Sequence, residues 1–128
     1  MKYDLVLMDA YFGAEVPPQL ATREFLDELR GVLKPGGVVV ANLPGPAVAA
    51  NFWSVLATYR VGFAQVRVFA KRSPSNFILL ASSADLSLDA GEMQRRIRKL
   101  KSRHRIDVDL AALANLTPPL GSDPQAAP

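Results

Sequence analysis

The fold of this chain is decided by two stretches of sequence, Lys2-Tyr-Asp-Leu-Val-Leu-Met-Asp9 and Gly37-Val-Val-Val-Ala-Asn-Leu43. Each contains a short apolar run of the kind that forms a strand. Between them, from about Gln19 to Leu33, apolar side chains recur at helical spacing. The segment Lys34-Pro-Gly-Gly37 ends that helix, because proline cannot continue it and glycine takes the turn. The pattern predicts a strand–helix–strand unit.

We expect residues 3–9 and 38–43 to be buried strands, since an apolar run without alternation suits a sheet covered on both faces. The first strand ends in Asp9, and residues 10–18 form a loop. In open α/β sheets, ligands bind at the carboxyl ends of the strands. Asp9 is therefore the first candidate for chemistry.

The rest of the chain continues the alternation. A short link between the last two strands predicts that they pair antiparallel. Glu92 three residues after Asp89 resembles a capping box and predicts the start of a helix. The further elements that we expect are helices 47–61 and 90–103, strands 66–70 and 77–81, a turn over 71–76, and a short helix from Asp107 to Asn115.

The composition limits the class of protein. A chain of 128 residues allows one domain with a modest core, and 49% of its residues are hydrophobic. It has no cysteine and one histidine, which excludes disulfides and Cys- or His-based zinc sites, so we expect no bound metal. No apolar run approaches the ~20 residues of a membrane helix, and the N-terminus lacks the features of a signal peptide. We expect a cytoplasmic protein that binds no membrane.

The net charge of +3 hides an asymmetry. Seven Lys or Arg residues lie between Arg95 and Arg105, and the rest of the chain has eight basic residues against twelve acidic ones. We interpret the run as the solvated face of a helix whose apolar stripe packs on protein, and we expect no nucleic-acid binding, since no aromatics are interleaved with the cations.

Three segments carry a resemblance to a known family: Tyr3-Asp-Leu-Val-Leu-Met-Asp-Ala10, Leu20-Ala-Thr-Arg-Glu-Phe25 and Leu33-Lys-Pro-Gly-Gly-Val-Val-Val-Ala41. Together they resemble the C-terminal half of spermidine synthases (polyamine aminopropyltransferases), and more closely the bacterial spermidine synthase-like proteins. The similarity is clear over residues 2–43 and fainter to about 84. The resemblance implies the class I S-adenosylmethionine methyltransferase fold, of which this chain would be the second half.

The resemblance also implies site residues and a co-substrate. It implies that Asp9 binds the amine and accepts its proton, with decarboxylated S-adenosylmethionine or S-adenosylmethionine held near Asp9 and Ala10. Tyr11, Glu15 and Gln19 are candidates for binding the amine substrate. A tightly bound cofactor is not expected.

Two departures from the family put putrescine as substrate in doubt. Spermidine synthases place a second aspartate three residues after the first, where this chain has Phe12. Glu15 can substitute only if the loop folds back. The family also has a tyrosine in the turn before the last strand, whereas residues 71–76 contain Lys71 and Arg72 and no tyrosine.

Each of these residues can also have a purely structural role. Tyr11 can be a loop residue packed on the helix, and Asp9 a turn or cap residue. Thr22 fits a helix cap better than a ligand contact. Asn42 ends the second strand on the carboxyl side, where a turn role before Pro44 competes with a hydrogen bond to a ligand.

The organisation that we expect is a Rossmann-like half-domain over residues 1–84, a helical extension with the basic helix over 85–116, and a disordered tail over 117–128. The glycine-rich cofactor loop of the fold is not in this sequence, and Gly36 and Gly37 close a helix rather than open one. Strand 3–9 then presents an apolar edge, which recruits partners. We expect a homodimer through this edge, or pairing with a missing N-terminal half, and we expect the chain to be a fragment.

Three functions are compatible with these patterns. The first is aminopropyl transfer to an amine by a domain that is incomplete as this chain. The second is S-adenosylmethionine-dependent methyl transfer on the same fold, which the loss of the paired acid favours. The third is a non-catalytic chain that dimerises through its exposed edge.

Overall fold

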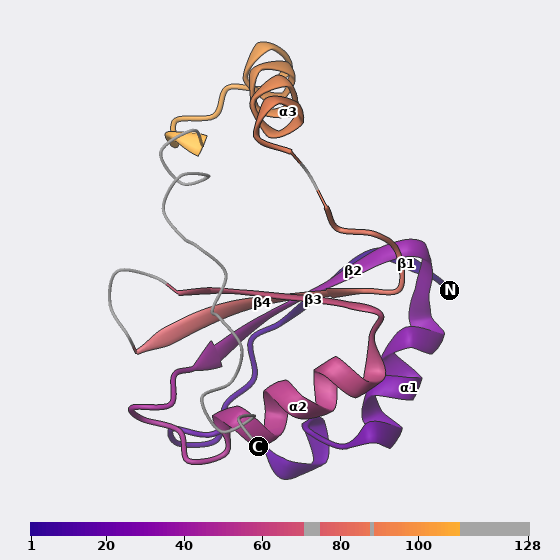
Figure 1. Cartoon of the computed structure of the whole chain (residues 1–128), viewed down its shortest axis with the longest axis vertical. Helices are drawn as coiled ribbons and strands as arrows, with labels where there is room; N and C mark the ends of the chain where they lie inside the picture. The colour runs from indigo at the N-terminus through magenta and orange to yellow at the C-terminus, as the bar shows by residue number, and fades with distance from the viewer. Residues whose placement is uncertain (71–74, 88, 111–128) are drawn as a thin grey trace. The chain divides into compact units, whose positions relative to one another are not determined.

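The computed structural model describes residues 1–70, 75–87 and 89–110. It divides the chain into two compact units, with residues 1–85 in the first and the residues from Leu86 onward that are described in the second. Figure 1 shows strands and helices following one another along the first unit. Among its described residues they are β1 (Tyr3–Met8), the one-turn helix η1 (Pro18–Leu20), α1 (Arg23–Val32), β2 (Leu33–Pro44), α2 (Phe52–Gly62), β3 (Gln65–Ala70) and β4 (Asn76–Ser82). The second unit contains α3 (Ala90–Arg103).

The four strands form one open sheet in the order β1-β2-β4-β3. β1 runs parallel to β2, with Leu5 opposite Val38, and β4 runs antiparallel to both β2 and β3. The predicted antiparallel pairing of the last two strands is confirmed, and so is the α/β class. β4 lies between β2 and β3, so the order of the strands in the sheet differs from their order in the sequence.

Helices α1 and α2 both lie on one face of this sheet (Figure 1). The buried side chains of the strands alternate toward that face and pack on apolar residues of the helices. The most deeply buried side chains of this core are Phe52, Leu26, Leu56, Leu79, Val39 and Val55.

The prediction that residues 3–9 form a fully buried strand is wrong. β1 is an edge strand, and Leu5 and Leu7 are 50% and 69% exposed. Because α1 and α2 cover one face only, the odd-numbered residues of β1 project from the other face. β1 thus forms the edge of the sheet, as expected, and its exposed apolar side chains lie on the face that the helices leave uncovered.

Helix boundaries differ from the predictions in two places. The helix expected over 19–33 begins with Thr22 as its cap, whose hydroxyl accepts a hydrogen bond of 3.2 Å from the Phe25 backbone N–H. The helix expected over 47–61 starts only at Phe52, since Pro44-Gly-Pro46 is followed by turns. The helix over 90–103 and its Asp89 cap are confirmed, with a 2.7 Å bond from the Glu92 N–H.

Close packing at the start of β2 explains one of its glycines. A Cβ on Gly37 would lie 3.0 Å from the backbone oxygens of both Tyr3 and Lys34. Gly37 thus lets β1 approach β2 at the end of the sheet opposite Asp9. This position confirms that the glycine pair does not open a helix.

Several predictions fall outside the described residues. They are the charge pair Lys71 and Arg72 in the turn, the greater part of the short helix from Asp107 to Asn115, and the tail over 117–128. The domain boundaries at 84 and 116 remain predictions.

Candidate functional site

Four polar side chains meet at the carboxyl ends of β1 and β2. Asp9 follows β1, Asn42 lies near the end of β2, Asn76 opens β4, and Tyr11 lies in the loop after Asp9. We call these four residues the strand-end cluster. Asn42 and Asn76 project from the same face of the sheet, because β4 runs antiparallel to β2 with Asn42 opposite Ile78 and Pro44 opposite Asn76.

Hydrogen bonds link the members of the strand-end cluster. The Asn42 Nδ2 donates to Asp9 Oδ1 over 3.1 Å, and the Asn76 Nδ2 donates to Asn42 Oδ1 over 3.1 Å. The Tyr11 hydroxyl lies near enough to Asp9 and Asn76 for both side chains to influence its pKa. Asp9 itself is exposed, so one face of its carboxylate remains open to solvent.

The pKa of the Tyr11 hydroxyl is raised from 10.0 to about 12. Partial burial is the largest cause, followed by the hydrogen bond to Asp9 and the negative charge of that carboxylate, while Asn76 acts in the opposite direction. The Tyr11 hydroxyl therefore keeps its proton at physiological pH.

The loop after Asp9 folds back on itself. Phe12 and Glu15 exchange two backbone hydrogen bonds, of 3.0 and 3.3 Å, and Gly13 takes a φ of +64° in the turn between them. The backbone of Glu15 therefore lies beside that of Phe12, whose side chain is 85% exposed. The loop thus folds back at residues 12–15, and the role of Glu15 as a second acid stays a prediction.

Ala10 and Gln19 lie outside the strand-end cluster. Ala10 lines a crevice of about 10 Å³, room for about one water molecule, together with Val16, Leu20 and Tyr59. Gln19 is an exposed residue of η1, and its backbone oxygen accepts a hydrogen bond from the Thr22 hydroxyl.

Sequence reasoning missed one member of the cluster and undervalued another. Asn42 was noted at the carboxyl end of its strand, which is a usable signal. Asn76 was not found, because its place beside Asn42 depends on β4 pairing with β2 rather than on any local pattern.

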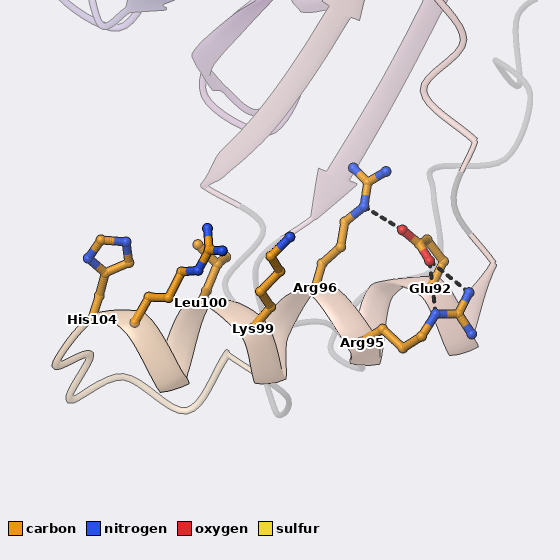
Figure 2. Close-up of a pocket in the computed structure, with 7 residues that line it drawn as sticks. Glu92, Arg95, Arg96, Lys99, Leu100 and His104 are labelled. Atoms are coloured by element: carbon orange, nitrogen blue, oxygen red, sulfur yellow. Dashed lines mark hydrogen bonds and ion pairs between the residues drawn. The ribbon is translucent and has the colours of Figure 1, made fainter.

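A second candidate surface lies on α3, within the second unit. Glu92, Arg95, Arg96, Lys99, Leu100, Arg103 and His104 line a shallow groove along the helix. Figure 2 shows Glu92 between Arg95 and Arg96, to which it is paired over 2.7 and 2.8 Å. These two cations hold the pKa of the Glu92 carboxyl below its usual range. The pairs are exposed and contribute little to stability.

The described residues contain no group of His, Cys, Asp and Glu side chains arranged to hold a metal ion. Within that same part of the chain, no helix is long and apolar enough to cross a membrane.

Comparison with known proteins confirms the resemblance to the aminopropyltransferase family. The chain is 42% identical over 64 residues to a polyamine aminopropyltransferase of Vibrio vulnificus and 43% identical over 42 residues to a probable polyamine aminopropyl transferase of Bifidobacterium longum. These matches span 50% and 33% of this chain but only 21% and 9% of the two relatives. No family model matches.

Solved structures share the fold. A probable spermidine synthase from Corynebacterium glutamicum is similar with a TM-score of 0.61 and 28% identity, over 76% of this chain and 37% of that one. Human methyltransferase-like protein 13 in complex with SAH has a TM-score of 0.64 over 83% of this chain and 50% of that one. At 22% identity this second likeness shows the fold alone. The chain therefore corresponds to part of a class I methyltransferase-type domain.

Proposed function

We propose that this chain carries the acceptor-amine part of an aminopropyltransferase site, in which an amine receives the aminopropyl group of decarboxylated S-adenosylmethionine. The observation that carries the proposal is the exposed Asp9 carboxylate, held by Asn42 at the carboxyl end of β1. It lies in one of the segments whose sequence resembles spermidine synthases, and the chain is similar to enzymes named for this reaction.

The chemistry needs a carboxylate at this position. A free alkylamine has a pKa of about 10 and arrives protonated at neutral pH. Asp9 would bind the ammonium group and accept one of its protons, which frees the nitrogen lone pair to attack the carbon bonded to the sulfonium sulfur. The new C–N bond forms while the C–S bond breaks, its electron pair stays on sulfur, and methylthioadenosine leaves. The proton on Asp9 then passes to water.

Glu15 and Tyr11 complete the proposed amine site. The turn over 12–15 brings the Glu15 backbone beside Phe12, where spermidine synthases have a second acid, so Glu15 would take a further ammonium group. The neutral Tyr11 hydroxyl would steady the Asp9 carboxylate. Gln19, on the exposed η1, would contact the distal part of the acceptor.

The binding of the co-substrate, decarboxylated S-adenosylmethionine, involves Ala10 and residues outside this half-domain in our proposal. The crevice below Ala10 is too small for a ligand group, so any contact of Ala10 with decarboxylated S-adenosylmethionine would be made from outside it. The chain spans about a fifth of the Vibrio relative, and we propose that residues beyond this half-domain complete the nucleoside pocket. A cytoplasmic location belongs to the same proposal.

Methyl transfer from S-adenosylmethionine is the second candidate. The fold shared with an SAH-bound methyltransferase-like protein and the replacement of the second acid by Phe12 favour it. A non-catalytic dimer is the third candidate, supported by the exposed Leu5 and Leu7 on the edge strand. A homodimer through β1 is compatible with all three.

Calorimetric titration separates these functions. The purified chain, whose mass in solution is measured in parallel, is titrated with decarboxylated S-adenosylmethionine, S-adenosylmethionine and methylthioadenosine. Preference for the decarboxylated compound over S-adenosylmethionine supports aminopropyl transfer, and the reverse preference supports methyl transfer. Binding of none of the three by a clean dimer supports the non-catalytic reading.

A further inference from the structure

We propose that Asn76 is a positioning residue that sets the orientation of the Asp9 carboxylate through the side-chain amide of Asn42. This inference rests on the proposed function of Asp9 for its biological meaning. Its structural part stands on two consecutive hydrogen bonds, Asn76 to Asn42 and Asn42 to Asp9, each 3.1 Å long.

The side-chain amide of asparagine has two chemically different ends. Its oxygen only accepts hydrogen bonds and its nitrogen only donates, and the two ends have nearly the same shape. Asn42 alone can therefore present either end to Asp9. The nitrogen binds a carboxylate, whereas the oxygen repels it.

Asn76 decides between these two orientations. Its Nδ2 group donates to Asn42 Oδ1, which turns the Asn42 nitrogen toward Asp9 Oδ1. The bond from Asn76 is partly buried, so water competes less for the Asn42 oxygen than it does at the exposed bond to Asp9.

These two bonds lead to Asp9 Oδ1 and leave the other side of the exposed carboxylate for a ligand. With the Asn42 Nδ2 donating to it, the carboxylate is held in one rotation before an amine arrives. Pre-orientation of a charged group lowers the ordering cost of binding. Asn76 achieves this from a third strand, without contacting the substrate-facing side of Asp9.

Nuclear magnetic resonance tests this proposal without requiring activity. The parent chain, Asn76→Ala and Asn51→Ala are compared by measuring the nuclear Overhauser contacts between the Asn42 side-chain amide and Asp9, and the exchange of the Asn42 Nδ2 protons with water. Asn51 is the matched control, because its Nδ2 donates to the Val16 carbonyl over 2.9 Å, outside the strand-end cluster.

In the parent, the Asn42 Nδ2 protons are expected to show nuclear Overhauser contacts to the Asp9 side chain. In Asn76→Ala, the Asn42 amide is free to rotate, so these contacts weaken and the Nδ2 protons exchange faster with water. Asn51→Ala is expected to keep the parent behaviour. The proposal is overturned if Asn76→Ala, with its backbone spectrum otherwise intact, leaves both the contacts and the exchange rate unchanged.

A separate titration with 1-aminopropane or putrescine keeps this result apart from the proposed function. If the contacts between Asn42 and Asp9 weaken in Asn76→Ala as expected but no amine perturbs the Asp9 region in the parent, the positioning role stands and the function fails. If an amine binds at Asp9 equally well in the parent and in Asn76→Ala, the positioning role fails and the function stands.

Discussion

The side-chain amide of Asn42 lies 3.1 Å from the carboxylate of Asp9, although the two residues are 33 positions apart in the chain. The parallel pairing of β1 with β2 creates this proximity, because Met8 lies opposite Ala41 and the next residue of each strand is a polar one. An acid at the end of one strand thus gains a fixed donor at the end of its neighbour. This pair is the centre of the proposed amine site.

High pH should destabilise the protein through its tyrosines. The pKa values of Tyr11 and Tyr59 are each raised from 10.0 to about 12, that of Tyr59 by burial. A raised pKa means that the folded state holds the proton more tightly than the unfolded chain does. The resulting stabilisation is complete below pH 10 and is lost as the pH rises toward 12.

We therefore expect the free energy of unfolding in urea to fall between about pH 10 and pH 12, with about 2–3 kcal/mol of the loss due to the buried Tyr59. Tyr59→Phe keeps the ring in the core and removes the titrating group, so the decline should be shallower in this variant. An equally steep decline in Tyr59→Phe would show that another group causes it.

The order of elements was predictable because its signals are local. Thr22 and Asp89 precede their helices as capping residues, and the structure shows both side chains accepting the expected backbone N–H bonds. Proline and glycine after Leu33 stop the first helix at Val32. Each of these features needs only a few neighbouring residues.

The burial of β1 and the role of Asn76 were not predictable in the same way. An apolar run shows that a strand is hydrophobic, but not that helices cover only one face of its sheet. Asn76 approaches Asn42 only because β4 inserts beside β2, a pairing between residues more than thirty positions apart. The candidate site was thus half predicted: Asp9, Tyr11 and Asn42 were visible as strand-end residues, and their partner was not.

Replacing Gly37 and Gly31 with alanine should have different effects on the free energy of unfolding. Gly37→Ala would place a Cβ 3.0 Å from two backbone oxygens, and we expect a loss of about 1–3 kcal/mol from the free energy of unfolding. Gly31 lies in α1 with nothing within 4 Å of an added Cβ, so Gly31→Ala should be neutral or gain up to about 1 kcal/mol. Urea denaturation of both variants checks the pair. Equal effects would contradict the close packing of β1 on β2.

The exposed edge offers a test of the expected homodimer. Leu7 on β1 and Val61 on α2 are both 69% exposed, so they form a matched pair. If two copies associate through β1, Leu7→Lys should place an uncompensated charge in the interface and yield a monomer, while Val61→Lys should remain a dimer. Light scattering after gel filtration measures the mass. A parent that is monomeric, or a Leu7→Lys variant that stays dimeric, would count against an interface at β1.

The central claim is that Asp9 binds the acceptor amine, and its most direct measurement is an amine titration of the isotope-labelled parent and Asp9→Asn chains. The account predicts that 1-aminopropane and putrescine shift the resonances of Asp9, Tyr11 and Asn42, and that Asp9→Asn weakens binding roughly 10- to 100-fold, since a charge-assisted hydrogen bond contributes about 1.5–3 kcal/mol. No shift at these residues in the parent, or the same affinity in Asp9→Asn, would contradict it.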